Sequence, residues 1–207
     1  MKETIRPAVV SLVAFTVLLG VVYPLVMDGV AAVVFPHQAT GSLVRDKEGH
    51  VVGSELVGQP FDNPAYFWSR LTAQANYDAS YSTGTNQGPS SFIDDKGQLG
   101  PNATLAKNAQ DRIDALRAAD PGNTAPVPVD LVTASSSGLD PHISPAAAYY
   151  QVDRVARLRG QSPDAIKQLV EEYTDGRTLG LLGEPRVNVL LLNRALDEKF
   201  GPAKPHG

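Results

Sequence analysis

The 207-residue chain contains no cysteine, so it has neither a disulfide framework nor thiolate chemistry. Cations are also scarce, with 18 Lys and Arg against 22 Asp and Glu, which gives a formal net charge of -4. Nucleic-acid binding needs a basic face, and this balance argues against such a partner. Only four histidines are present, and none has the H-x-H or H-E-x-x-H spacing of a metal site. They are His37, His50, His142 and His206. We therefore predict no metal site.

Motifs for phosphoryl transfer are missing as well. The glycines at positions 84 and 88 are not followed by Gly-Lys-Ser/Thr, and no Asp-Lys-Thr-Gly phosphorylation motif occurs. The sequence thus provides no route by which this chain alone would hydrolyse ATP.

One long uncharged segment stands near the N-terminus. Residues Pro7–Met27 carry no charge, and after Asp28 the apolar character continues to Phe35. About 20 helical residues cross a hydrocarbon core roughly 30 Å thick. We expect a transmembrane helix with a membrane-edge extension over residues 7–35, after a short N-terminal segment of residues 1–6. A cleaved signal peptide, cut at the small residues Gly29–Ala31, is the alternative.

The flanking charges predict the orientation of this helix. Lys2, Arg6 and the terminal amine precede it, whereas Asp28 follows it and the next cation is Arg45. By the positive-inside rule, the N-terminus is cytoplasmic and residues 36–207 lie outside the cytoplasm. The sequence therefore predicts a single-pass protein of the cytoplasmic membrane with an extracytoplasmic domain.

The exported part is expected to be one loop-rich α+β domain, because the chain has 18 glycines and 16 prolines. A hairpin is predicted from Leu43–Arg45, a turn, and His50–Gln59. The aromatic stretch Phe61–Leu71 indicates a corner of the core, and Thr72–Gly100 a long surface loop. Residues 125–134 are expected to form an edge strand or an extended connector.

Four helices are expected, each with start or stop signals. The first begins near Asn102 or Thr104 and ends before Asp120–Asn123. The next has Ser144 as N-cap, Pro145 at its first position and Gly160 as C-cap, with Arg154, Arg157 and Arg159 near the negative end of its dipole. A third is capped by Ser162 before Pro163, and a fourth closes the chain over Val189–Phe200.

The polar stretch "TASSSGLDPHISP" combines residue types that catalyse hydrolysis. A Ser-His-Asp hydrolase requires groups that converge from separate segments, whereas these lie in one loop and no G-x-S-x-G elbow occurs. We favour a structural or partner-contacting loop that leads into a helix. An ion or nucleotide cradle at the helix N-terminus is the functional alternative. The residues concerned are Ser135, Ser136, Ser137, Gly138, Asp140, His142 and Ser144.

Six stretches, in this order and spacing, make the chain resemble the C subunit of the bacterial Kdp-type potassium-transporting ATPase. They are "RPAVVSLVAFTVLLGVVYPL" (Arg6–Leu25), "ATGSLV" (Ala39–Val44), "GSELVGQPF" (Gly53–Phe61), "YFWSRLTA" (Tyr66–Ala73), "VDLVTASSSGLDPHISPAAA" (Val129–Ala148) and "LGEPRVNVLLLNRALD" (Leu182–Asp197). The resemblance covers nearly the whole chain.

This resemblance implies a non-catalytic accessory subunit of an ATP-driven potassium uptake complex. Its partners would be a channel-like subunit, a P-type ATPase subunit and a small membrane subunit. The family is described as a catalytic chaperone that assists assembly and raises the ATP affinity of the ATPase subunit. The alternatives are a membrane-anchored ligand-binding module and a Ser/His/Asp hydrolase.

No tightly bound cofactor is expected, and an association with ATP is implied by the resemblance alone. The family tends to have Ser-Gly-Gly-Ser-Asn where this chain has Ser82–Asn86, and that loop has been likened to a nucleotide-contacting signature. Ser82, Gly84 and Asn86 are therefore weak nucleotide-binding candidates. Thr83 in place of a glycine reduces the backbone freedom of this loop. A second departure is Arg70–Ala73, where the family commonly has Arg-Pro-Ser-Ala.

Overall fold

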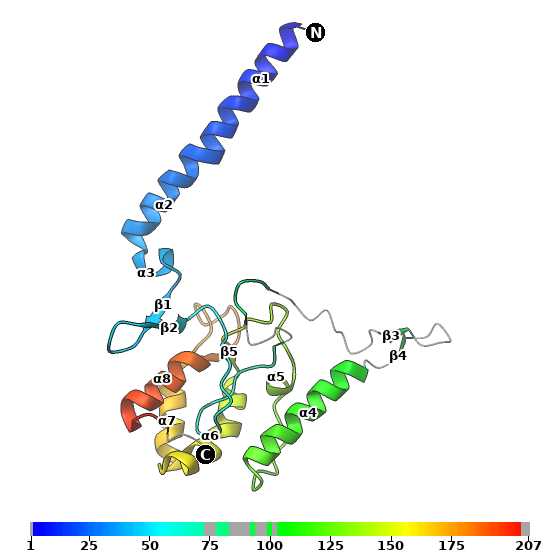
Figure 1. The fold of residues 1–207 in the computed structure, drawn as a ribbon, viewed down its shortest axis with the longest axis vertical. Helices are drawn as coiled ribbons and strands as arrows, with labels where there is room; N and C mark the ends of the chain where they lie inside the picture. Colours follow the sequence, from blue (N-terminus) through cyan, green and yellow to red (C-terminus); the bar gives the residue numbers. More distant parts are fainter. Residues whose placement is uncertain (1, 73–77, 83–91, 94–98, 101–102, 204–207) are drawn as a thin grey trace. The chain divides into compact units, whose positions relative to one another are not determined.

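The structure is a computed structural model that describes residues 2–72, 78–82, 92–93, 99–100 and 103–203. Its internal contacts divide the chain into two compact units, Met1–Ser54 and Glu55–Gly207. The boundaries expected from the sequence, at residues 6, 35 and 36, remain predictions. Within the described residues, the N-terminal half of the first unit is helical and the second unit combines helices with short strands, so the α+β prediction is confirmed (Figure 1).

The first unit begins with a long apolar helix. It consists of α1 (Lys2–Val17), a π-helical turn η1 (Leu18–Val22) and α2 (Tyr23–Val34). It spans the 32 residues Glu3–Val34, and its most apolar window of 18 residues has a mean hydropathy of 2.5, so the helix is long and apolar enough to cross a membrane. The predicted N-terminal apolar helix is confirmed.

Pro24 accounts for the π-helical turn in this helix. Proline has no backbone N–H, and its ring collides with the carbonyl four residues earlier in a regular α-helix. Here the Tyr23 N–H donates to the Leu18 carbonyl, five residues back. The hydrogen-bond ladder therefore widens by one residue just before the proline, and the helix continues.

A short helix α3 (Pro36–Ala39) and a hairpin complete the first unit. Strand β1 (Leu43–Arg45) pairs antiparallel with β2 (Val51–Ser54), with a register shift between Val44 and Arg45. The predicted hairpin is confirmed, but its second strand ends at Ser54 instead of Gln59. The ladder ends there because Ser54 pairs with Leu43, the first residue of β1. Further on, Gly58 donates its N–H to the Leu139 carbonyl of another loop, at 2.8 Å.

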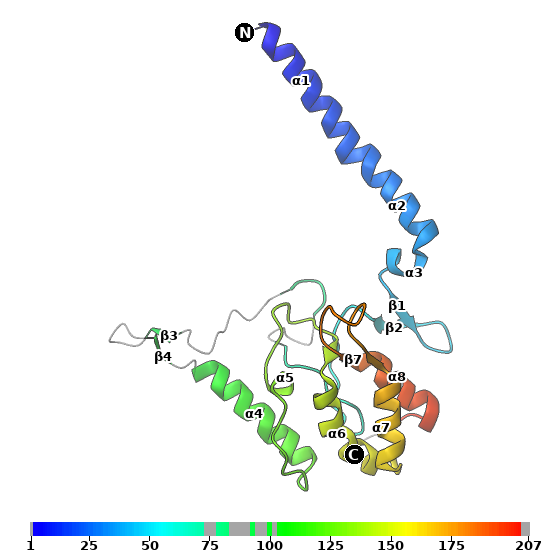
Figure 2. The ribbon, with the colours of Figure 1, turned by 180° about the vertical axis from the view of Figure 1, so that it is seen from behind.

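The second unit is built on three adjacent helices and a small antiparallel sheet (Figures 1 and 2). The helices are α6 (Pro145–Arg159), α7 (Pro163–Glu172) and α8 (Val189–Phe200). The sheet has the order β5-β7-β6, with β5 (His142–Ile143), β6 (Thr174–Asp175) and β7 (Arg186–Asn188). Strand β5 leads into α6 and β7 leads into α8, so the sheet fixes where both helices begin.

The helix caps confirm the predicted boundaries. The Ser144 hydroxyl accepts a hydrogen bond from the Ala147 N–H, and Ser162 does the same for Ala165. Gly160 ends α6 in the left-handed conformation, with φ of 64°. The cap of α8 is Asn188, whose side chain accepts from the Leu191 N–H.

Four further elements lie outside this bundle. They are α4 (Ala103–Ala119), the short helix α5 (Val129–Val132), and the strands β3 (Phe92–Ile93) and β4 (Leu99–Gly100), which pair antiparallel. Helix α4 confirms its prediction. The expected extended connector at 125–134 is wrong over α5, where Pro128 supplies a helix-compatible start. Most of the predicted loop at 72–100 lies outside the described residues.

The core of the second unit joins the aromatic stretch to the helices. Phe67 is fully buried and Trp68 is 7% exposed, which confirms the predicted core corner. Around them pack apolar side chains from α4 to α8, including Leu116, Leu131, Val152, Val155, Ile166, Val170, Leu192 and Leu196.

Candidate functional site

The polar loop between α5 and β5 is held in shape by its own hydroxyls. We call residues 134–142 the serine loop. The buried Ser135 hydroxyl accepts from the Gly138 N–H at 2.9 Å, and the Ser137 hydroxyl accepts from the Leu139 N–H at 3.1 Å. Gly138 has φ of 71°, a conformation that glycine adopts without steric cost. Ser136 is exposed. Two of the three consecutive serines therefore close a turn.

Gly58 fastens the serine loop from the side. Its N–H donates to the Leu139 carbonyl, and a Cβ at this position would lie only 2.8 Å from the Asp140 carbonyl oxygen. The two backbones thus approach more closely than any side chain would permit. This contact explains the glycine in "ELVGQPF".

Two side chains of the preceding segment reach the same loop. Thr72 donates its hydroxyl to the Gly138 carbonyl at 2.7 Å, and Ser82 donates to the Ser137 carbonyl at 2.9 Å. Ser82 was a nucleotide candidate, and here its hydroxyl satisfies a backbone group. Gly84 and Asn86, the other two candidates, lie outside the described residues.

Asp140 is the electrostatic centre of the serine loop. One carboxylate oxygen lies 3.0 Å from the Arg70 guanidinium. The other accepts the His142 backbone N–H at 3.0 Å and lies 3.4 Å from His142 Nδ1. Burial raises the pKa of the Asp140 carboxyl, but the hydrogen bonds from His142 and the nearby charge of Arg70 outweigh it. The pKa of Asp140 is consequently below its usual value.

The lowered pKa of Asp140 predicts a pH-dependent contribution to stability. Its ionised form is favoured in the folded state, so the contribution is present above the unfolded pKa of about 4 and is lost as pH falls through the lower folded value. Asp140→Asn is expected to reduce the free energy of unfolding by about 1–2 kcal/mol at pH 7. In denaturant titrations of the full chain, its difference from the parent should shrink below about pH 4.

A surface carboxylate is the control for this experiment. Asp111 is 61% exposed and pairs with Lys107 across one helical turn, so Asp111→Asn should change stability by under about 1 kcal/mol. Equal effects of the two substitutions at every pH would contradict the role assigned to Asp140.

Ser144 has two partners, and both are structural. The Ser144 hydroxyl caps α6. In addition, the Asp130 carboxylate accepts hydrogen bonds from the Ser144 N–H at 2.7 Å and from the Ser144 hydroxyl at 3.2 Å. Asp130 lies in α5, so this contact joins two helices. Among the described residues, none of the serine hydroxyls of the loop donates to His142. The hydroxyls thus bond to backbone groups, to each other and to Asp130.

An open cleft of about 800 Å³ lies against the serine loop. Its lining is mixed and includes the apolar Leu56 and Val57 as well as the charged Arg70 and Asp140. The remaining lining residues are Ser82, Ala134, Ser135, Ser136, Ser137, Leu139 and Pro141. Arg70 is paired with Asp140. The positive charge of this arginine is therefore already balanced and gives the cleft little attraction for an anion.

The histidines do not gather around a metal position in the described part of the chain. His142 contacts Asp140, and His50 contacts Asp46 in the hairpin turn. The described residues contain no group of three potential ligands placed to hold a metal ion.

One polar network that was not expected from the sequence involves the backbone of Phe67 and Trp68. The Asn193 side-chain amide accepts the Phe67 N–H at 2.8 Å and donates to the Phe67 carbonyl at 2.9 Å. Gln151 forms the same pair of bonds with Trp68, at 2.8 and 3.2 Å. Amide side chains of α6 and α8 thus satisfy the backbone groups of this segment, which belongs to no helix or strand.

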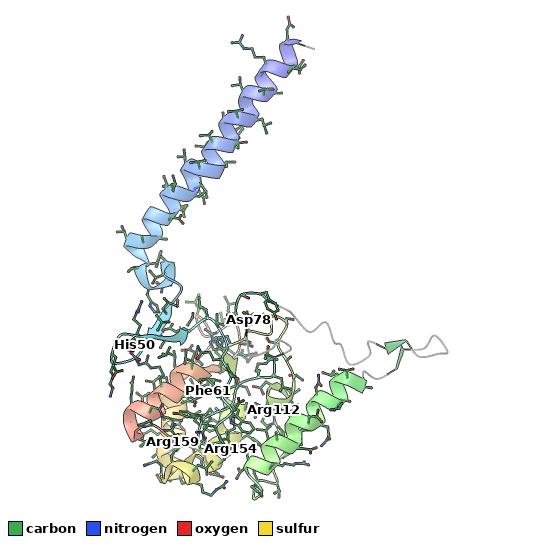
Figure 3. The ribbon with its side chains drawn as sticks, in the orientation of Figure 1. His50, Phe61, Asp78, Arg112, Arg154 and Arg159 are labelled. Carbon is green, nitrogen blue, oxygen red and sulfur yellow. The ribbon has the colours of Figure 1, made fainter. Side chains whose placement is uncertain are left out.

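Two guanidinium groups lie over the Trp68 ring, Arg112 at 4.8 Å and Arg154 at 4.9 Å from its centroid. Figure 3 labels both arginines, which come from α4 and α6. Arg154 is 1% exposed and donates to the carbonyls of Pro64 and Tyr66. Burial lowers its pKa to about 10, so it remains protonated at neutral pH. This ring and the two cations tie the aromatic segment to both helices.

The arginines of α6 therefore do more than complement the helix dipole. Arg154 points into the core and lies outside the last turn of the helix, which carries Arg157 and Arg159. Arg159 lies 4.5 Å from the Tyr66 ring and 2.9 Å from Asp197, and Arg157 pairs with Asp120 at 2.8 Å. A signal for Arg154 was its spacing of seven residues from Ala147, which places both on the buried face of the helix.

The folded unit and the apolar helix define a class of protein: a membrane-associated chain with one N-terminal apolar helix and a mixed helix and small-sheet domain. The pattern that defines the family "KdpC: K+-transporting ATPase, c chain" matches residues 5–198. The chain belongs to this family.

Similar proteins cover nearly its whole length, and each is named "Potassium-transporting ATPase KdpC subunit". One from Methylococcus capsulatus is 55% identical over 194 residues, which is 93% of this chain and 96% of that protein. One from Sorangium cellulosum is 56% identical, covering 95% and 98%. One from Herpetosiphon aurantiacus is 54% identical, covering 96% and 97%. The resemblance found in the sequence is confirmed.

Proposed function

We propose that this chain is a non-catalytic accessory subunit that assembles and stabilises an ATP-driven potassium uptake complex. The observation that carries the proposal is the family match over residues 5–198, which includes both the apolar helix and the folded unit. A match confined to the apolar helix would indicate only a membrane anchor, and a match confined to the folded unit would indicate only a domain of unknown function. The relatives named as subunits of a potassium-transporting ATPase share the full arrangement.

The contacts of the serine loop support a structural role over hydrolysis. A catalytic serine donates its hydroxyl proton to a base, usually a histidine. In this loop Ser135 and Ser137 satisfy N–H groups of the turn, and Ser144 caps α6. His142 contacts the same Asp140 that Arg70 neutralises. The loop thus presents a formed surface to a partner.

The charges around the helix support an orientation with the N-terminus inside. Lys2 and Arg6 precede the apolar segment, and Asp28 lies near its other end. Cations next to a membrane helix favour the cytoplasmic side. The folded unit, residues 55–207, would then face the outside of the cytoplasmic membrane.

This orientation bears on how the chain would affect ATP use. Nucleotide is cytoplasmic, so a domain outside the membrane reaches it only through other subunits. Any increase in ATP affinity is then a coupling between two sites across the complex. The partners required are a channel-like subunit, a P-type ATPase subunit and a small membrane subunit, with no tightly bound cofactor on this chain.

The cleft beside the serine loop favours a second candidate, a ligand-binding module. Its volume suits a small molecule, and its serine hydroxyls offer polar contacts. Calorimetric titration of ATP into the full chain, purified in detergent without partners, separates the two functions. The accessory role predicts no saturable binding, whereas binding that Arg70→Met abolishes would favour the ligand-binding module.

Affinity purification from a bacterial membrane tests the accessory role itself. A tagged full-length chain, co-expressed with the other subunits, is expected to recover at least two further integral membrane proteins in constant ratio. Recovery of the tagged chain alone, while the others still assemble with one another, would contradict the proposal.

A further inference from the structure

The segment between β6 and β7 forms a closed, self-supporting loop. We call residues Arg177–Glu184 the leucine loop. Thr178 and Leu182 exchange backbone hydrogen bonds of 2.9 and 3.0 Å, and the Gly180 N–H donates to the Arg177 carbonyl at 3.0 Å. At the base, the Arg177 guanidinium contacts both Glu184 carboxylate oxygens, at 2.9 and 2.7 Å. The loop is thus braced by its own backbone and by one ion pair.

Its tip exposes large apolar side chains. Leu179 is 88% exposed, Leu181 81% and Leu182 63%. Among the described residues of this unit, other exposed apolar side chains, such as Val129 at 71%, have no such neighbours in sequence. Single exposed hydrophobic residues are ordinary, whereas a cluster marks an interaction surface.

Leu179 also has a backbone conformation that leucine disfavours. Its φ is 55°, in the left-handed region where glycine is the least strained residue. Gly180 and Gly183, in the same loop, have φ of 74° and 78°. A glycine at position 179 would relieve strain without removing any core contact. The Leu179 side chain therefore does not stabilise the folded unit. This indicates that the side chain has a role in contacts outside that unit.

The size and composition of the tip favour lipid over protein as its partner. A specific protein interface buries about 800 Å² on each side, which a few leucine side chains do not provide. Leucine is also under-represented among the residues that dominate protein interfaces, and the leucine loop has no aromatic residue. A small apolar surface suffices when the chain is already anchored, because tethering makes the second contact intramolecular.

The backbone and charges of the loop also suit an apolar medium. N–H groups of Thr178, Gly180, Leu181 and Leu182 all donate within the loop. These four groups need no hydrogen-bond partner from the surrounding medium, and hydrocarbon offers none. The charges of Arg177 and Glu184 at the base of the loop neutralise each other. Neither charge therefore has to be desolvated alone when the tip approaches lipid.

We propose that the leucine loop inserts its tip into the surface of the lipid bilayer in which the N-terminal helix is anchored. The folded unit is then held to the membrane at two points, which restricts how it can turn. This inference rests on the anchoring helix of the proposed function. It does not require the partner subunits, and it holds for either leaflet.

The absence of cysteine makes a direct test possible, because one introduced cysteine is the only labelling site. Leu181→Cys carries an environment-sensitive fluorophore on the full-length chain, reconstituted alone into vesicles of phosphatidylethanolamine and phosphatidylglycerol. Val129→Cys, also exposed and apolar, is the matched control. A nitroxide on the phospholipid acyl chains quenches only fluorophores that enter the bilayer.

Loss of most of the fluorescence of the Leu181→Cys chain is expected, with that of Val129→Cys nearly unchanged. The loss should be as large in phosphatidylcholine vesicles, because insertion depends on apolar contact and not on anionic headgroups. With the reporter moved to Leu179→Cys, Leu181→Ser and Leu182→Ser together should remove the quenching.

Equal fluorescence of the two labelled chains would overturn the inference. A second result would also overturn it. In that result, the Leu181→Cys fluorophore becomes shielded from water only when the other subunits are present, and the nitroxide lipid does not quench it. The partner of the leucine loop would then be a protein. Either result leaves co-purification with the complex unaffected. A chain that inserts its leucine loop but recovers no partner proteins would instead contradict the proposed function alone.

Discussion

A chain that ends at Ser54 is expected to reach the membrane but to support no potassium uptake above background. It keeps the apolar helix and the hairpin, which form one compact unit, and it loses the whole second unit. The serine loop, the cleft and the leucine loop all belong to the missing part. If the folded unit makes the contacts that assemble the transporter, the anchor alone cannot replace them.

Rubidium uptake at low external potassium, in cells that lack their own high-affinity system, measures this effect. The full-length chain with the same C-terminal tag is the control for expression. A second control replaces residues 3–34 with an unrelated apolar helix of equal length, which keeps the folded unit at the membrane. Normal uptake by the truncated chain would show that the folded unit is dispensable and would contradict the proposed function.

Replacing Gln151 with leucine is expected to lower the free energy of unfolding by about 3–5 kcal/mol, the largest single-residue effect that we predict. The substitution conserves approximate volume but removes both backbone bonds to Trp68. It also removes the acceptor 2.6 Å from the Arg154 guanidinium. A buried N–H, a buried carbonyl and a buried cation each lose a partner, and a polar group left without a hydrogen bond in the core is costly.

Chemical denaturation of the full chain in detergent, followed by Trp68 fluorescence, measures the loss. The matched control is Gln110→Leu, the same chemical change on the exposed face of α4, where the side chain bonds Asp114. This control should differ from the parent by less than about 0.5 kcal/mol. Similar losses for the two leucine variants would mean that the amide network contributes little to the fold.

The helices could be predicted from the sequence because their signals are local. Ser144 and Pro145, Ser162 and Pro163, and Gly160 act on backbone groups within a few residues of themselves. The structure confirms each of these boundaries. The serine loop was favoured as structural for the same reason, since a cap uses a hydroxyl that catalysis would need free.

The sheet and the arginine network depend on contacts between distant residues, which local signals do not encode. Strands β5 and β6 have two residues each, too short for an alternating pattern. Arg154 meets Pro64 across 90 positions of the chain, and Asn193 meets Phe67 across 126. The sequence signal for these contacts was a polar residue on the apolar face of a helix. This pattern does not predict which backbone group the polar side chain will satisfy.

The nucleotide candidates illustrate a different limit. They came from the resemblance and not from a phosphate-binding pattern, and of the three only Ser82 lies among the described residues. Its hydroxyl bonds the Ser137 carbonyl. An association of this chain with ATP stays a prediction that the titration described above tests.

The central claim is that the folded unit lies outside the cytoplasm and acts there within the complex. Labelling of a single cysteine at position 129 tests it most directly, because Val129 is 71% exposed and the parent chain has no cysteine. The assembled complex, carrying Val129→Cys, is expressed in bacterial spheroplasts and treated with a membrane-impermeant maleimide. We predict full labelling of intact spheroplasts, unchanged after lysis. Labelling that occurs only after lysis would place the folded unit in the cytoplasm and contradict the account.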